Sequence, residues 1–165
     1  MMNKCLLIAY QKELVSACLD DFAAAYPLNT IHGGLFGDTP LAWAAYAQDF
    51  IYINLISNLI EIQDATYYPK IDDLITTTLS FDVSNWDLNW HGVFFDGTKK
   101  LETLAEKYDL CKWECRDSPL NSNFITEIIK IYSDFDTLTK DCDARIAQQR
   151  IAIAKRVLTQ LVGAD

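Results

Sequence analysis

The chain has 165 residues, a formal net charge of −9 and a pI near 4.6, so it lacks the basic surface that binding to nucleic-acid phosphates requires. Half of its residues are hydrophobic and 12% are aromatic, which is enough for a packed core and excludes a largely disordered chain. No apolar stretch approaches the length of a membrane span, and the N-terminus does not have the pattern of a signal peptide. We therefore expect one cytoplasmic domain over residues 1–165, with no membrane partner.

The first half of the chain predicts helices separated by Gly- and Pro-rich loops. Residues 6–22 are rich in apolar residues whose spacing is helical from Leu14 onward, and Lys12-Glu13 is a candidate link between two short helices. After a loop, Thr39 predicts an N-cap and Pro40 the first residue of a helix. A second helical run over residues 49–62 follows directly, with Asp49 as its expected cap.

The second half is also mainly helical. Residues 64–81 leave helix and strand open, and the aromatic alternation that follows favours a short hairpin or extended finger at 82–96. A helix is expected from Thr98, its N-cap, as far as Cys115, and residues 116–122 break the chain. Residues 123–162 contain neither Gly nor Pro and predict one long helix, or two with a break near 141–143.

A turn occurs twice in this chain. "HGGLFGDT" begins at His32, and "HGVFFDGT" begins at His91. Gly and Asp adopt positive φ at low cost, and each Thr can cap the helix that follows. We expect these two turns to connect helices.

The stretch "GDTPLAWAAYAQDFIYINLI", within Gly37–Ile60, resembles an ankyrin repeat, whose signature is G-x-T-P-L-H-x-A-A followed by a second helix. The matching residues are Gly37, Thr39, Pro40, Leu41, Ala44 and Ala45. Ala42 replaces the usual His, and Gln48 occupies the position of the Gly between the two helices. The resemblance implies a mainly α fold of degenerate stacked helix pairs over 1–117, covered by a C-terminal helix or helix pair at 118–165.

The sequence contains no recognisable catalytic grouping and no complete set of metal ligands. His32 and His91 recur with the turn, which favours a structural role over a pair of catalytic or metal-binding imidazoles. Cys111 and Cys115 would share one face of a helix, but no second pair of ligands has suitable spacing. We expect no metal, no cofactor and no enzymatic activity. A small hydrolase-type enzyme built around His32, His91 and Cys111 is the less favoured alternative.

Aromatic and acidic side chains alternate in the expected finger and in the first turn. Such a mixture suits recognition of a basic protein, although the aromatic residues could instead form core beneath a long loop. The predicted binding residues are Trp86, Asp87, Trp90, His91, Phe94 and Asp96 in the finger and Phe36 and Asp38 in the first turn.

The expected function is therefore that of a non-enzymatic protein-binding module with a basic protein partner. Two narrower alternatives are a bacterial immunity protein that neutralises a cognate toxin and a bacterial effector directed at a host protein. The basic residues near the C-terminus have two interpretations, which are complementing a helix dipole and forming a contact surface. They are Arg145, Arg150, Lys155 and Arg156.

Overall fold

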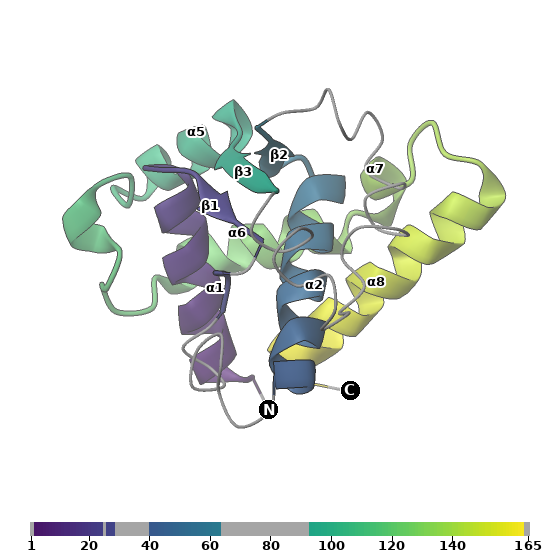
Figure 1. Cartoon of the computed structure of the whole chain (residues 1–165), viewed down its shortest axis with the longest axis horizontal. Coiled ribbons are helices and arrows are strands. Elements are labelled where there is room, and N and C mark those ends of the chain that lie inside the picture. The colour runs from purple at the N-terminus through teal and green to yellow at the C-terminus, as the bar shows by residue number, and fades with distance from the viewer. Residues whose placement is uncertain (1, 25, 29–39, 64–92, 164–165) are drawn as a thin grey trace.

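The computed structural model of the chain describes residues 2–24, 26–28, 40–63 and 93–163. These residues form a mainly helical domain with a small antiparallel sheet, so the predicted fold class is confirmed at that level (Figure 1). The elements in chain order are α1 (Lys4–Ala17), β1 (Phe22–Ala23), α2 (Pro40–Ile56), β2 (Ile60–Ile62), β3 (Phe94–Gly97), α5 (Lys99–Lys107), the 3-10 helix η2 (Trp113–Cys115), α6 (Ser122–Ser133), α7 (Phe135–Leu138) and α8 (Ala144–Val162).

Helix α2 is the centre of the core, between α1 and α8 in Figure 1. Its residues from 49 to 56 are all buried, including the polar Asp49 and Asn54. A helix that is apolar on every side must be covered on every side, and α1, α8 and the sheet provide that cover. The Asn54 amide donates to the Phe50 carbonyl, and its own oxygen accepts from the Tyr132 hydroxyl at 2.8 Å.

Two helices were predicted where the structure has the single helix α2. The helix continues through Gln48, where the ankyrin resemblance requires a loop, and Asp49 lies within the helix instead of capping a new one. Stacked ankyrin-like helix pairs are therefore not confirmed. The start of the helix agrees with the prediction, because Pro40 is its first residue, whereas Thr39 lies outside the described residues.

Helix α2 ends at Ile56 and is followed by Asn58 and then a strand, in a region that was predicted to be helix. Asn58 has φ of 55°, and the Leu59 N–H donates to the Asn54 carbonyl, which is the left-handed ending that Gly usually provides. The chain then enters β2, which pairs with β3.

The sheet has the strand order β1-β3-β2, and both pairs are antiparallel. Phe22 is opposite Phe95, and Glu61 is opposite Asp96. β3 packs close to the end of α1, because a Cβ placed on Gly97 would lie 2.5 Å from the Ala17 carbonyl oxygen. Gly97 is therefore required for close packing and not for the positive φ expected of a turn, since Gly163 is the positive-φ glycine of the described residues.

Thr98 confirms the prediction of an N-cap. Its hydroxyl oxygen accepts from the Leu101 N–H, and the same hydroxyl donates to the Asn58 carbonyl at 2.8 Å. One side chain thus starts α5 and attaches it to the end of α2. The predicted helix does not reach Cys115, because α5 ends at Lys107 and only the short η2 follows.

The C-terminal segment contains three helices, α6, α7 and α8, where one or two were predicted, because an additional break occurs at Asp134. The predicted non-helical segment at 116–122 precedes them, although α6 already begins at Ser122. The expected break near 141–143 is confirmed, and Asp143 caps α8 by accepting from the Arg145 and Ile146 N–H groups. The Asn3 N–H donates to the Leu161 carbonyl, so the described ends of the chain lie together.

Neither of the two interpretations of the basic C-terminal residues describes Arg156, which forms an ion pair within the protein. Its guanidinium pairs with the buried Asp49 carboxylate of α2, with Nε 2.8 Å from Oδ2, and Gln160 donates to the same carboxylate. Arg156 therefore joins α8 to the core. Within the described parts of the chain, no helix combines the length and the apolar character needed to cross a bilayer.

Candidate functional site

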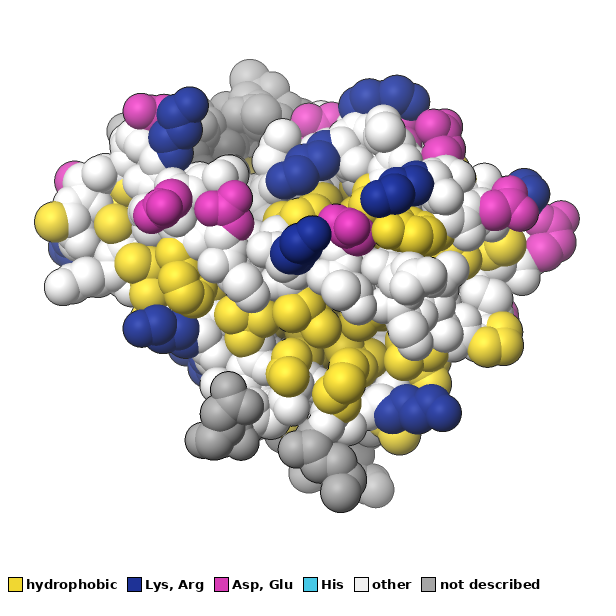
Figure 2. Space-filling view, turned by 180° about the vertical axis from the view of Figure 1, so that it is seen from behind, with side chains coloured by type: hydrophobic (Ala, Val, Ile, Leu, Met, Phe, Trp, Pro, Cys, Tyr) yellow, Lys and Arg dark blue, Asp and Glu magenta, His cyan; other side chains and the backbone are white. Residues whose placement is uncertain are grey.

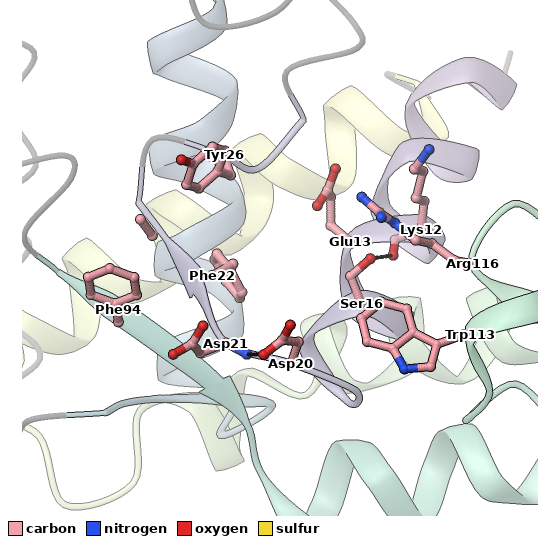
Figure 3. Close-up of a pocket in the computed structure, with 11 residues that line it drawn as sticks. Lys12, Glu13, Ser16, Asp20, Asp21, Phe22, Tyr26, Phe94, Trp113 and Arg116 are labelled. Atoms are coloured by element: carbon pink, nitrogen blue, oxygen red, sulfur yellow. Dashed lines mark hydrogen bonds between the residues drawn. The ribbon is translucent and has the colours of Figure 1, made fainter.

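A pocket of about 320 Å³ lies between α1 and β1, and we call it the α1–β1 groove (Figure 3). Its residues come from α1, from β1 and the chain on either side of it, from β3, and from η2 with the residue that follows. They are Lys12, Glu13, Ser16, Asp20, Asp21, Phe22, Ala23, Tyr26, Phe94, Trp113 and Arg116. The groove thus brings the N-terminal part of the chain together with β3 and η2, which are distant from it in sequence.

Exposed aromatic side chains surround this groove. Among the described residues, five large hydrophobic side chains are exposed, and three of them line the groove: Tyr26 at 49%, Phe94 at 39% and Trp113 at 54%. Phe22, packed against the buried Phe95 ring, forms part of the same lining. Clustered exposed aromatic groups are characteristic of surfaces that bind a partner.

The wall that carries Trp113 and Arg116 is attached firmly to α1. The buried Gln11 side chain donates to the Pro119 carbonyl at 3.0 Å and accepts from the Asn121 N–H at 2.7 Å. On the surface, Lys12 Nζ lies 2.6 Å from Asp117 Oδ1. Because this wall is already ordered, binding of a partner costs less conformational entropy than it would if the wall became ordered on binding.

The charges of the groove are segregated (Figure 3). Lys12, Glu13 and Arg116 lie on one side, whereas Asp20 and Asp21 lie near Phe22 on another. The guanidinium of Arg116 has no ion pair or side-chain hydrogen bond within the described part of the chain.

Glu13 is a half-buried titratable group of this pocket. Burial raises its pKa from 4.5 to about 7, and this rise is partly offset by a hydrogen bond with the Leu28 backbone and by the positive charges of Arg116 and Lys12. The described residues place no cation within ion-pair distance of its carboxylate. The fold therefore carries a carboxylate whose ionisation is costly.

Replacing Glu13 with Gln should stabilise the protein at pH 8 by about 1–3 kcal/mol, because a raised folded-state pKa means that ionisation destabilises the fold. The wild-type protein loses this stability as the pH rises from about 4.5 to about 7, and the variant does not. Urea unfolding of both proteins at pH 5 and pH 8 measures the difference. If the variant exceeded the wild type in free energy of unfolding by the same amount at both pH values, this explanation would be contradicted.

A second, acidic hollow of about 310 Å³ adjoins the groove and shares Asp20 and Asp21 with it. Asp96 and Glu102 line it as well. The pKa of Asp96 is raised, first by partial burial and then by the negative charges of Asp21 and Asp20. Negative potential is thus concentrated where β1 and β3 meet the end of α1.

Two of the predicted binding residues can be placed, and they lie in this region. Phe94 lines the groove, and Asp96 lines the adjoining acidic hollow. The other predicted residues lie outside the described part of the chain, as does His32, and they stay predictions: Trp86, Asp87, Trp90, His91, Phe36 and Asp38.

The sequence interpretation missed Glu13, Tyr26, Trp113 and Arg116. The Lys12-Glu13 pair was noticed, but it was interpreted as a link between helices, whereas α1 runs through it without a break. Trp113 lies between Lys112 and Glu114, and a Trp flanked by charged residues is a signal of exposure that could have identified it.

The cysteines show no metal chemistry in the described residues. Cys111 and Cys115 do not share a helix, since only Cys115 belongs to η2, and the five thiols are free. Burial, followed by the proximity of Cys111, raises the pKa of the Cys18 thiol to about 12. No group of three or more His, Cys, Asp or Glu side chains capable of holding a metal occurs within the described ranges.

The face opposite to that of Figure 1 is the one seen in Figure 2. Figure 2 shows hydrophobic side chains gathered over its centre and lower part, with Lys and Arg side chains beside them. The α1–β1 groove is distinguished by its hollow shape and by the separation of its charges.

Comparisons with protein-family models, with curated proteins and with solved structures each give no match.

Proposed function

We propose that the protein is a non-enzymatic binding module that recognises a segment of a basic protein partner in the α1–β1 groove. The observation that supports this most is the gathering of Tyr26, Phe94 and Trp113 around one pocket. Exposing aromatic surface to water is costly, and association with a partner removes that cost. The net charge of −9 favours a partner of opposite sign.

Two polar side chains of the groove, Ser16 and Lys12, already have partners within the protein. The hydroxyl of Ser16 donates to the Lys12 carbonyl at 2.9 Å, and Lys12 itself is paired with Asp117. These polar groups are occupied within the protein. The aromatic side chains supply a large contact area at a small cost in side-chain entropy.

The experiment is a selection from a random peptide library on the immobilised full-length protein, followed by affinity measurements on the selected peptides. We expect Trp113→Ala and Phe94→Ala each to weaken binding by about tenfold or more, as is usual for aromatic hot spots. Met2→Ala removes an exposed hydrophobic side chain outside the groove and should leave the affinity unchanged.

Unfolding measurements on each variant verify that the fold is kept. If no peptide is selected, or if the selected peptides bind the Trp113 and Phe94 variants as tightly as the wild type, the proposed function is wrong.

A further inference from the structure

We propose that the partner segment bound in the α1–β1 groove presents an arginine to Asp20 and Asp21, with apolar neighbours packed on the aromatic lining. This inference rests on the proposed function and specifies the chemistry of the partner. It follows from three observations: where the charges of the groove lie, which aromatic rings lie next to Asp20 and Asp21, and which hydrogen bonds these two aspartates form.

The acidic end of the groove is the part that attracts a cation. Lys12 is neutralised by Asp117, and Arg116 lies on the other side of the groove, toward Glu13. Asp20 and Asp21 have no ion pair with any described residue, and Asp96 in the adjoining hollow adds a third negative charge nearby. A positive side chain placed here gains favourable interactions with all three carboxylates.

Both aspartates are held in place without being neutralised. Asp20 Oδ1 accepts from the Asp21 N–H at 3.0 Å, and Asp21 Oδ2 accepts from the Gln63 amide at 3.0 Å. Each carboxylate keeps further acceptor sites, because an ionised carboxylate has about four. The carboxylates are therefore oriented in advance for a donor that the described residues do not supply.

The adjacent rings favour arginine over lysine. Phe22 and Phe94 line the groove next to the acidic end, as Figure 3 shows. A guanidinium group stacks on aromatic faces and donates two parallel hydrogen bonds to carboxylates, whereas the ammonium of lysine is a compact and strongly hydrated charge. The aromatic rings beside the carboxylates therefore suit a guanidinium group, which can stack on the rings and donate hydrogen bonds to the carboxylates.

The groove also continues along α1, which suits an extended segment. A neighbouring hollow of about 470 Å³ is lined by Cys5, Ile8 and Ala9 together with Lys12 and Arg116, which it shares with the groove. Ile8 is itself an exposed hydrophobic side chain. Apolar residues of the partner on one side of the arginine thus pack on a surface that extends to the first turns of α1.

The test uses peptides selected on the full-length protein as probes. We expect them to be enriched in arginine next to an apolar residue. Replacing that arginine with citrulline, which keeps the shape and removes the charge, should weaken binding by about tenfold, and lysine should restore only part of the affinity.

On the protein, the double change Asp20→Asn and Asp21→Asn should have a similar effect, because asparagine keeps both hydrogen-bond acceptors and removes both charges. The double change Asp136→Asn and Asp141→Asn removes two exposed carboxylates that lie outside the groove and should change the affinity by less than about threefold. It is the matched control.

The outcomes separate this inference from the proposed function. Peptides that depend on Trp113 and Phe94 but tolerate citrulline would overturn the inference and leave the proposed function standing. Peptides that bind independently of both aromatic residues would overturn both. Self-association of the protein that Trp113→Ala abolishes, measured by sedimentation, would identify a second copy as the occupant and also overturn the inference.

Discussion

Replacing Arg156 with Ala is expected to destabilise the protein by about 3–5 kcal/mol, because the change leaves the buried Asp49 carboxylate without its charged partner. The Asp49 side chain is only 4% exposed, whereas that of Arg156 is 52% exposed. The arginine is half in water, so most of the expected cost comes from the aspartate. After the change, the amide of Gln160 is the remaining side-chain donor to Asp49 among the described residues.

Arg145→Ala provides a matched control for this prediction. Arg145 lies on the same helix and is exposed at its start, where a positive charge opposes the helix dipole. Its removal should change the stability by less than about 0.5 kcal/mol. Urea unfolding at neutral pH measures all three proteins, and a loss below about 1 kcal/mol for Arg156→Ala would contradict the proposed role of the pair.

A double variant distinguishes the loss of a partner from the loss of packing. If the uncompensated charge of Asp49 is the cause, combining Asp49→Leu with Arg156→Ala should recover most of the stability, because the buried carboxylate that had lost its partner is then absent. If the methylene groups of Arg156 matter more than its charge, the single and double variants should be equally unstable.

Local signals in the sequence predicted the starts of three helices correctly. Pro40 and Thr98 stand at helix starts because the geometry of a first turn depends on a few adjacent residues. The break before α8 was visible for the same reason, since Asp143 caps a helix whose apolar spacing begins again after it.

Signals that depend on distant parts of the chain were misread. The run around Asp49 looked like the start of a new helix, because a capping residue followed by Ile and Leu has that pattern. Its true explanation is the contact with Arg156, which lies 107 residues further along the chain. A buried acid in the middle of a helix cannot be recognised until its partner is known.

The sheet was equally hard to predict, because its strands have between two and four residues. Such short segments show no period-two alternation, and only their pairing defines them. The groove depends on that pairing, since β3 brings Phe94 beside β1. The aromatic and acidic character of the site was thus predictable at Phe94 and Asp96, whereas the contributions of α1 and η2 were not.

Replacing Gly97 with Ala is expected to destabilise the protein by about 3 kcal/mol or more, at the upper end of the effects of overpacking. The new Cβ would lie 2.5 Å from the Ala17 carbonyl oxygen and 2.9 Å from the carbonyl carbon. Both are backbone atoms at the end of α1, so no rotation of a side chain can relieve the contact. Either β3 or the last turn of α1 has to move.

Thermal unfolding of Gly97→Ala, alone and combined with Ala17→Gly, tests this explanation. The second change should give no rescue, because it removes a methyl group and leaves the carbonyl in place. The displaced strand should also weaken the binding of groove-selected peptides, since Phe94 and the chain leading to Asp20 and Asp21 adjoin the contact. A Gly97→Ala protein with wild-type stability would show that α1 and β3 do not meet as closely as described. The acidic end of the groove, which depends on that close contact, would then also be described wrongly.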